Sequence, residues 1–268
     1  MFDALFVPQA LSVPQALSVP QGLPVGDTDI PNKVVVDLAK IKKIFSRGKA
    51  RKKNTKKLRV AVVFAGRATC YEETCEWFSK LSEKYAVDFY CSISAELNEY
   101  YKGFLDLFSV KKYKFGTMDQ FTNPDMSKRA RNPRLMFYNL KTVVDMVPLS
   151  DYDVILYARV DMVCTDDIDL SVAKGLDNVV FIPSGYDWGG TNDQMAFGTP
   201  SAMFTYSRLY DSFADCIYRE GSPGGVDTDV NSNVNPEKTL STHLENVALD
   251  VRRFELQYHL HPKRCDLE

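Results

Sequence analysis

The sequence lacks long hydrophobic runs and is poor in cysteine, histidine and tryptophan. Its longest apolar runs, such as residues 60–65, fall far short of the roughly 18 residues that a membrane span needs. Six cysteines among 268 residues are too few for a disulfide-built scaffold, and no Cys-x-x-Cys pair indicates zinc, so we expect reduced thiols. Hydrophobic residues make up 45% and charged residues 25%. These ordinary values exclude a wholly disordered chain, a collagen and a coiled-coil rod.

The N-terminal region lacks the features of a signal peptide, because it has neither a basic start nor an unbroken apolar stretch. We therefore expect a cytoplasmic protein. Residues 7–12 and 13–18 both read VPQALS, and residues 19–24 read VPQGLP. Proline at this density opposes both helices and sheet ladders, which favours an extended arm. We predict a proline-rich repeat tail and linker over residues 1–57 and a globular domain over residues 58–268.

Charge is distributed unevenly along the chain. Residues 40–59 contain 11 Lys or Arg and no Asp or Glu, although the whole chain has a formal charge of -2. The remaining residues carry 22 basic and 35 acidic side chains, or a formal charge of -13. The basic block is either a solvated linker or a contact for nucleic acid or an anionic membrane surface. A non-enzymatic binding module that uses this block is the alternative to the enzyme hypothesis below.

The hydrophobic pattern beyond residue 58 alternates between strands and helices. It predicts strands at 58–64, 87–93, 110–115, 153–158, 179–182, 194–197 and 251–260. It predicts helices at 71–85, around 97–108, from Pro133 to about 147, at 199–219 and at 235–247, with a loop at 116–132. Thr69 and Glu72 have the spacing of a capping box for the first helix. The early alternation indicates an α/β protein with a mostly parallel central sheet flanked by helices, whose ligands sit at the carboxyl ends of the strands.

The first candidate segment, Phe64-Ala65-Gly66-Arg67, ends the first predicted strand. Glycine lets a backbone approach a ligand closely, and Arg67 can meet a phosphate or stack on a base. The simpler alternative is a tight turn with a surface arginine.

The second candidate segment follows the most apolar strand, at residues 157–161. Arg159 and Asp161 point to the same side if the strand continues, so they can grip a diphosphate and a divalent metal. The alternative is an Arg–Asp ion pair that closes the strand end. Asp166 and Asp167 follow, and we expect them to be turn or helix-start residues.

The third candidate segment, Ser184–Gln194, reads SGYDWGGTNDQ. An aromatic ring can pack on the C–H face of a sugar, while carboxamide and carboxylate groups pair with its hydroxyls. Asp193 is the candidate general base. The residues that we expect to bind this sugar are Trp188, Gly189, Gly190 and Asn192. The alternative is a turn-rich hairpin.

The fourth candidate segment is Asn235-Pro236-Glu237 with His243. A carboxylate such as Glu237 is favoured in the first turn of a helix by the helix dipole, whatever the function. His243 is one of three histidines. Three roles remain open for it: a metal ligand, a phosphate contact, or a structural histidine with satisfied ring nitrogens.

Together these segments resemble glycosyltransferases of the GT-A fold. The resemblance covers about residues 58–262 and rests on RVD at 159–161, WGGTNDQMAFG at 188–198 and NPEKTLSTHL at 235–244. The sequence is similar to predicted glycosyltransferases of algae and large DNA viruses. The resemblance implies a GT-A-like fold, a nucleotide-sugar donor and a glycan acceptor. A sugar-nucleotide nucleotidyltransferase fits less well, because residues 65–67 match its glycine-rich loop poorly.

The resemblance also implies roles for the candidate residues. Asp161 takes the place of the second aspartate of an Asp-x-Asp motif, which binds Mn²⁺ or Mg²⁺ together with the donor diphosphate. Arg159 stands where the first aspartate is expected, so either Asp161 with His243 or another carboxylate holds the metal, or Arg159 replaces part of its charge. The segment 64–67 receives the nucleotide, and Asp193 deprotonates the acceptor hydroxyl in an inverting displacement. A retaining outcome stays open.

Overall fold

The computed structural model describes residues 57–116, 128–216 and 234–261, without the side chains of residues 128–131. These residues belong to a compact unit that spans Val36–Glu268. The predicted repeat tail and nearly all of the basic block lie outside the described residues, so the predicted domain division remains a prediction.

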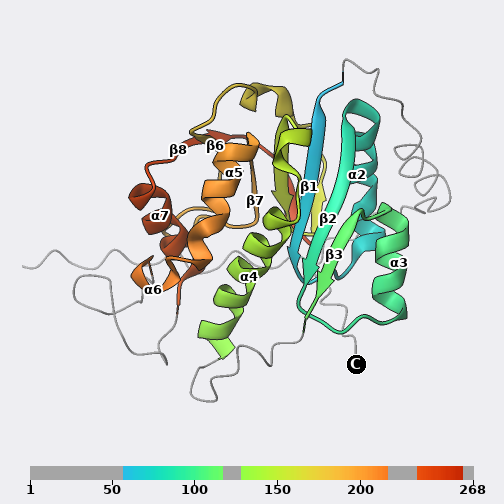
Figure 1. Cartoon of the computed structure of the whole chain (residues 1–268), viewed down its shortest axis with the longest axis horizontal. Helices are drawn as coiled ribbons and strands as arrows, with labels where there is room; N and C mark the ends of the chain where they lie inside the picture. The colour runs from blue at the N-terminus through green and yellow to red at the C-terminus, as the bar shows by residue number, and fades with distance from the viewer. Residues whose placement is uncertain (1–56, 117–127, 217–233, 262–268) are drawn as a thin grey trace, which may run out of the picture. The chain divides into compact units, whose positions relative to one another are not determined.

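The described residues form a seven-stranded sheet in the order β3-β2-β1-β4-β7-β6-β8 (Figure 1). Its strands are β1 Arg59–Gly66, β2 Ala86–Ile93, β3 Lys112–Phe115, β4 Val154–Ala158, β6 Val179–Pro183, β7 Met195–Gly198 and β8 Asp250–Phe254. All neighbouring pairs are parallel except the two that involve β7, which runs antiparallel to both β4 and β6. Two short strands, β5 Met162–Cys164 and β9 Tyr258–Leu260, form a separate antiparallel pair.

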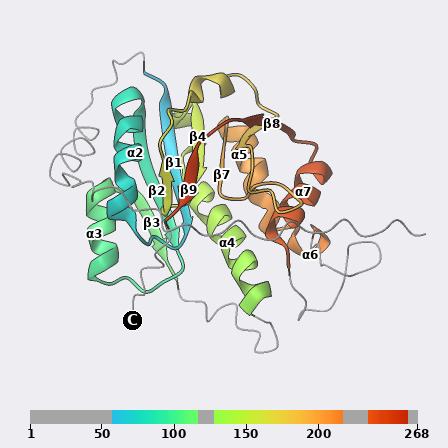
Figure 2. The same cartoon turned by 180° about the vertical axis from the view of Figure 1, so that it is seen from behind.

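Helices cover both faces of the sheet (Figure 2). The elements α2 Tyr71–Lys84 and α3 Glu99–Phe108 pack on one face. The elements α4 Lys128–Asp145, α5 Pro200–Ser207, α6 Phe213–Cys216 and α7 Pro236–Asn246 pack on the other. Short 3-10 turns lie at η2 Leu149–Asp151, η3 Leu170–Ala173 and η4 Arg208–Tyr210. The predicted α/β architecture, a mostly parallel sheet flanked by helices, is confirmed.

Strand β1 shows why its sequence is almost continuously apolar. Val60, Val62 and Phe64 face the core beneath α2 and α3, whereas Ala61 and Val63 face the core beneath α4. A parallel strand buried on both faces has no solvent side, so the sequence shows no alternation. Burial of each apolar side chain stabilises the fold by about 1.5–3 kcal/mol relative to exposure.

The starts of two helices differ from the predictions. The N-cap of α2 is Cys70 in a left-handed conformation with φ 56° and without a side-chain cap, so the predicted capping box is wrong. The backbone N–H of Cys70 instead donates to the hydroxyl of Tyr100 at 2.9 Å. Pro133 lies inside α4 rather than at its first position. Proline removes one hydrogen bond of the preceding turn, and the helix continues past that loss.

Two predicted elements near the C-terminus are divided in the structure. The helix expected at 199–219 consists of α5, η4 and α6 over its described part. The strand expected at 251–260 splits into β8, which pairs with β6, and β9, which pairs with β5. Apolar and polar residues alternate along both parts, but β8 and β9 belong to different sheets.

Candidate functional site

The second and third candidate segments meet at the carboxyl-terminal edge of the parallel strands. Arg159 follows β4, and the segment 184–194 connects the end of β6 with β7. The backbone N–H of Arg159 donates to the carbonyl of Gln194 at 3.1 Å. This bond ties the second and third segments together, as expected for a site at this edge.

The segment 184–194 is held by an internal network centred on Asp187. Its Oδ1 accepts from the backbone N–H of Asn192 at 2.9 Å and from Nη2 of Arg253 at 2.7 Å. Arg253, on β8, also donates to the carbonyl of Pro183 at 2.9 Å. Charge-assisted hydrogen bonds of this kind are stronger than neutral ones, so the loop is fixed without a ligand.

Asn192 belongs to the hydrogen-bond network that holds this loop. It is fully buried, and its Nδ2 donates to the carbonyl of Gly185 at 2.8 Å and to the Tyr258 hydroxyl at 2.6 Å. Its Oδ1 accepts from the backbone N–H of Gln194 at 2.9 Å. Both amide hydrogens and the carbonyl oxygen of Asn192 thus have partners within the protein, and its predicted contact with the acceptor stays a prediction.

Two aromatic residues of the loop have unusual backbones. Tyr186 and Trp188 have φ of 54° and 43°, between Gly185 and Gly189 with φ of 83° each. For bulky residues this left-handed region is strained and persists only where the surroundings impose it. Trp188 nevertheless leaves 69% of its surface exposed. The loop therefore presents an aromatic ring to solvent at a conformational cost.

The loop is seated on the first turn of α7. The backbone N–H of Thr191 donates to the carbonyl of Glu237 at 2.9 Å, and the hydroxyls of Thr191 and Ser241 lie 2.7 Å apart. A Cβ at Gly190 would lie 2.3 Å from the Glu237 carbonyl carbon and 2.3 Å from the Lys238 nitrogen. Gly190 thus permits close packing on α7, a role distinct from the predicted acceptor contact.

Asp193 is buried at the end of this loop, with 7% of its surface exposed. Burial raises the pKa of its carboxyl from 3.8 to about 6, against the opposing charge of Arg159. Arg159 acts on this carboxylate through its charge, and among the described residues no side chain donates a hydrogen bond to it. A carboxylate with a pKa near 6 is ionised at neutral pH and is a stronger base than an exposed aspartate.

Glu237 is a second carboxyl group with a perturbed pKa. Burial and the negative charge of Asp193 raise the pKa of Glu237 from 4.5 to about 7. Its half-buried position follows from the packing of the loop on α7. The sequence indicates Glu237 only as a helix-start residue, and its spacing does not predict that the charge of Asp193 acts on it.

Arg159 and Asp161 form the ion pair that the simpler reading of their spacing predicts. Nε of Arg159 donates to Oδ1 of Asp161 at 2.9 Å, and Nη2 donates to Oδ2 at 2.7 Å. Both side chains remain partly exposed, at 37% for Arg159 and 17% for Asp161. The pair therefore presents a held guanidinium, rather than a free carboxylate, at the end of β4.

The residues predicted to bind a metal do not fit a metal site. Both carboxylate oxygens of Asp161 accept from Arg159. The Nδ1 of His243 lies 3.1 Å from Oγ of Ser212 and its Nε2 lies 3.2 Å from the carbonyl of Thr205. Burial lowers the pKa of this histidine, which keeps it neutral. Both ring nitrogens of His243 thus have possible partners within the protein, and its predicted metal role stays a prediction. No group of three or more metal-binding side chains occurs in the described ranges.

The first candidate segment provides mainly its backbone and one arginine. The Phe64 side chain is fully buried among the rings of Phe78 and Phe104, so it cannot contact a donor. Ala65 is also buried, whereas Gly66 has φ of 99° with open space where a Cβ would lie. Arg67 is exposed. Of the four residues in this segment, Gly66 and Arg67 therefore have accessible groups.

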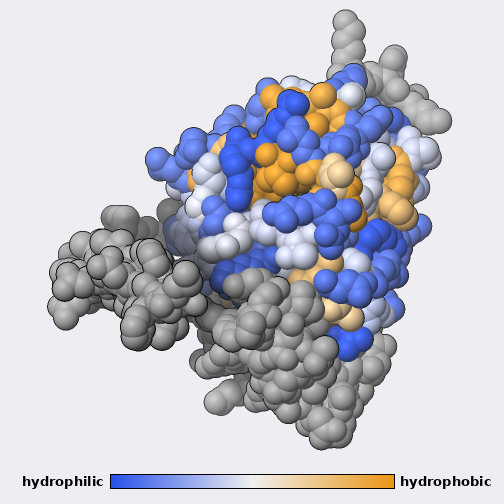
Figure 3. Space-filling model, turned by 90° about the vertical axis from the view of Figure 1, so that its left-hand side faces the viewer, coloured by the Kyte–Doolittle hydropathy of each residue, from blue (hydrophilic) through white to orange (hydrophobic). Residues whose placement is uncertain are grey.

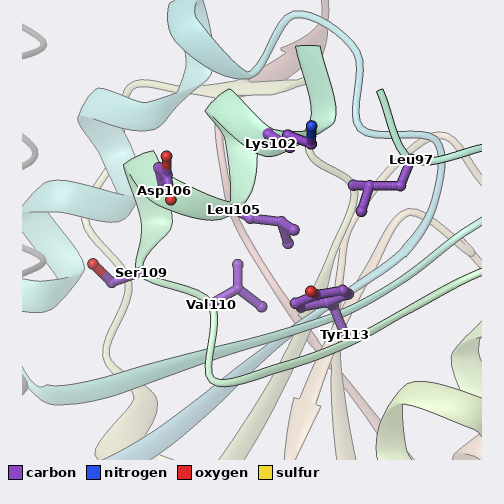
Figure 4. A pocket seen from close by; sticks show the side chains of 7 residues that line it. All are labelled: Leu97, Lys102, Leu105, Asp106, Ser109, Val110 and Tyr113. Atoms are coloured by element: carbon purple, nitrogen blue, oxygen red, sulfur yellow. The ribbon is translucent and has the colours of Figure 1, made fainter. Parts of the chain in front are cut away.

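A shallow pocket of about 380 Å³ lies away from these residues, beside α3 and β3 (Figure 4). Its lining consists of Leu97, Lys102, Leu105, Asp106, Ser109, Val110 and Tyr113. It contains none of the predicted site residues, so it does not support the candidate site.

Two buried tyrosines and one arginine complete the site and were not predicted. The hydroxyls of Tyr157 and Tyr206 are buried and, among the described residues, have no hydrogen-bond partner. Burial and the charge of Asp193 both raise the pKa of Tyr157, and burial is also the main cause of the raised pKa of Tyr206. Arg253 lies on β8, where the sequence indicates only a polar residue in a strand of alternating polar and apolar residues. These burial and charge effects follow from the fold and not from the local sequence.

The side of the molecule seen in Figure 3 is largely hydrophilic, with a hydrophobic area in its upper part.

The five cysteines that the structure describes are free and buried. None of the described helices has the length and hydrophobicity to cross a membrane.

Comparison with known proteins adds little to this geometry. No protein-family model and no curated protein matches the sequence. The fold is similar to the apo-form glycosyltransferase GlyE of Streptococcus pneumoniae TIGR4, with 13% sequence identity and a TM-score of 0.42. The match covers 74% of this chain and 45% of that chain. Similarity at this level carries no argument about activity.

Proposed function

We propose that this protein is a glycosyltransferase that moves a sugar from a nucleotide-sugar donor to a hydroxyl of a carbohydrate. The observation that carries the proposal is Asp193, a buried carboxylate with a pKa of about 6. It stands in a loop that is locked in place and presents an exposed Trp188. A base near neutral pH beside an aromatic platform is what deprotonation of a sugar hydroxyl requires.

The reaction is a single displacement. Asp193 takes the proton of the acceptor hydroxyl as its oxygen forms a bond to the anomeric carbon of the donor. The bond from that carbon to the diphosphate oxygen breaks, and the nucleoside diphosphate leaves with the electron pair. Arg159 is the group that stabilises this developing negative charge, with Arg67 and the open backbone at Gly66 on the donor side. Such a displacement inverts the configuration of the sugar.

No step of this mechanism passes through a metal, because the predicted ligands are engaged elsewhere. The expected Mn²⁺ or Mg²⁺ dependence remains a prediction for experiment.

A donor screen tests the proposal. The full chain is incubated with UDP-, GDP- and dTDP-sugars, with and without Mn²⁺, while thermal stability and release of the nucleoside diphosphate are measured. We expect one donor class to raise the melting temperature and to be slowly hydrolysed. Asp193→Asn should abolish hydrolysis, whereas Asp215→Asn, an exposed carboxylate on α6, should behave as wild type. Silence with all donors, together with salt-sensitive binding to nucleic acid or anionic vesicles that is lost on deleting residues 1–57, would support the binding-module alternative instead.

A further inference from the structure

The loop of residues 184–194, which carries Asp193, is hydrogen-bonded to the small β5–β9 sheet. Its partner on β9 is Tyr258, a buried residue whose hydroxyl accepts from Nδ2 of Asn192 at 2.6 Å. The Tyr186 hydroxyl donates to the backbone carbonyl of Tyr258 at 3.3 Å, and the rings of these two tyrosines lie 5.0 Å apart. Tyr258 therefore meets the loop through its hydroxyl, its ring and its backbone.

Asn192, which directly precedes Asp193, has a side-chain amide that fits its neighbours in one orientation. Its Oδ1 accepts from the backbone N–H of Gln194 at 2.9 Å, and its Nδ2 donates to the carbonyl of Gly185 at 2.8 Å. The reversed amide would set an NH₂ group against an N–H and an oxygen against a carbonyl. The second hydrogen of Nδ2 is thus left for the Tyr258 hydroxyl, which accepts it. The amide therefore spans Asp193 and is itself held by Tyr258.

The β5–β9 sheet connects this contact with the other side of the candidate site. Strand β5 begins directly after Asp161, whose backbone carbonyl accepts from the N–H of His261 at 2.8 Å. Two residues further along the ladder, Tyr258 lies opposite Cys164. The loop is therefore tied to the Arg159–Asp161 ion pair by this sheet, in addition to the direct backbone hydrogen bond from Arg159 described above.

We infer that Tyr258 is a positioning residue for the transfer reaction, because it holds Asn192 and through it the backbone on both sides of Asp193. The inference rests on the proposed function. A general base must lie within hydrogen-bond distance of the proton that it takes, and a displacement of about 1 Å can lower a rate about a hundredfold. Tyr258 exchanges no proton in this role, and the bond that it makes is buried, away from competing water.

Tyr258→Phe tests the inference, since it removes the hydroxyl and keeps the ring. With the donor found in the screen, transfer to methyl glycosides of glucose, galactose and mannose is measured. For the accepted glycoside we expect kcat to fall about tenfold to a hundredfold, with KM changed less than about twofold. Tyr85→Phe is the matched control. The buried Tyr85 hydroxyl, at the amino end of β2, donates to the carbonyl of Ile168 and accepts from the N–H of Leu170, both at 3.0 Å. Its loss should leave kcat unchanged.

A double-variant cycle shows whether the effect passes through Asn192. Asn192→Ala should lower kcat at least as much as Tyr258→Phe does, and the double variant should lose little more than Asn192→Ala alone, because both changes break the same bond. Additive losses, an unchanged kcat for Tyr258→Phe, an effect confined to KM, or an equal loss for Tyr85→Phe would overturn the inference and leave the transferase proposal intact.

Hydrogen exchange of the full chain tests the contact if no donor is active. The backbone N–H groups of Asn192 and Gln194 both donate to side chains within the loop. Tyr258→Phe should therefore speed their exchange about tenfold more than Tyr85→Phe does. Unchanged exchange at both amides refutes the inference whatever the activity. Faster exchange without activity toward any donor would support the hold of Tyr258 on the loop and assign the failure to the proposed function.

Discussion

Arg159 and Asp161 join through two parallel hydrogen bonds at the end of β4, 2.9 Å and 2.7 Å long. The fork of the guanidinium matches both oxygens of the carboxylate, which fixes the arginine while leaving it partly exposed. In the GT-A resemblance, Asp161 takes the place of the second, metal-binding aspartate and Arg159 that of the first.

The first prediction concerns this pair. Asp161→Asn removes the charge that holds the guanidinium, so we expect the Kd for the nucleoside diphosphate of the active donor to rise about threefold to tenfold, in line with the roughly 1 kcal/mol of a held hydrogen bond. Arg159→Ala should weaken binding more. Calorimetric titration measures both, with exposed Asp177→Asn as control. Tighter binding by Asp161→Asn would show that the pair opposes the donor.

The second prediction concerns the pH dependence of transfer. Because the pKa of Asp193 is about 6, the base is lost as pH falls through that value. Initial rates under kcat/KM conditions should fall about tenfold for each pH unit well below the pKa. Asp193→Asn should reduce kcat by 10² to 10⁴, the usual contribution of a general base. An acid limb that survives in the Asn variant would assign the titration to another group.

The third prediction concerns the effect of the Asp193 carboxylate on the stability of the fold. Its pKa is raised in the folded state, so the folded protein binds more protons than the unfolded chain between about pH 4 and 6, and stability is lost as pH rises through this window. Asp193→Asn should therefore be more stable than wild type at pH 8, by up to about 3 kcal/mol, and should lose this advantage near pH 4. Urea unfolding at the two pH values measures the difference. A constant difference would contradict the shifted pKa.

The fourth prediction concerns Gly190. Gly190→Ala should destabilise the protein by about 1–3 kcal/mol, because a Cβ would overlap the backbone of Glu237 and Lys238, which cannot rotate away. Gly175→Ala is the comparison, since Gly175 has φ of 78° but open space around a Cβ and should lose only about 1 kcal/mol through strain. Thermal unfolding of both variants shows whether the steric overlap at position 190 costs more stability than the backbone strain at position 175. Equal losses would argue against close packing of the loop on α7.

The fifth prediction concerns His243. Its pKa is lowered by burial, so the unfolded chain gains a proton before the folded protein does, and stability falls as pH drops through the unfolded pKa of about 6.5. His243→Gln should reduce the loss of stability between pH 7 and 5, although it lowers stability at pH 7 by breaking the contacts with Ser212 and Thr205. His259→Gln, at an exposed position, should leave the pH dependence unchanged. Stabilisation of wild type, but not of His243→Gln, by Mn²⁺ would support the metal role predicted for this histidine.

Local physical chemistry in the sequence determined the fold class and the edge at which to look for the site. The apolar run at Val60–Phe64 predicts a strand buried on both faces, and Asn235-Pro236 predicts the start of α7, where Asn235 caps Lys238 at 2.8 Å. Such signals are encoded by neighbours in the chain. The same rule for strand ends placed Arg159 and the segment 184–194 at one edge.

Tertiary structure decided which side chains meet there and which do not. Asn192 and His243 lie in motifs that predict ligand binding, yet in the structure the side chain of Asn192 is hydrogen-bonded to Gly185 and that of His243 to Ser212. Glu237 resembles an ordinary helix-start carboxylate until the packing of Gly190 brings α7 against the loop of Asp193. The pKa of Asp193 depends on burial and on Arg159, which lies 34 residues earlier in the sequence. Such contacts between distant residues are set by how the sheet and helices pack, which no local pattern in the sequence records.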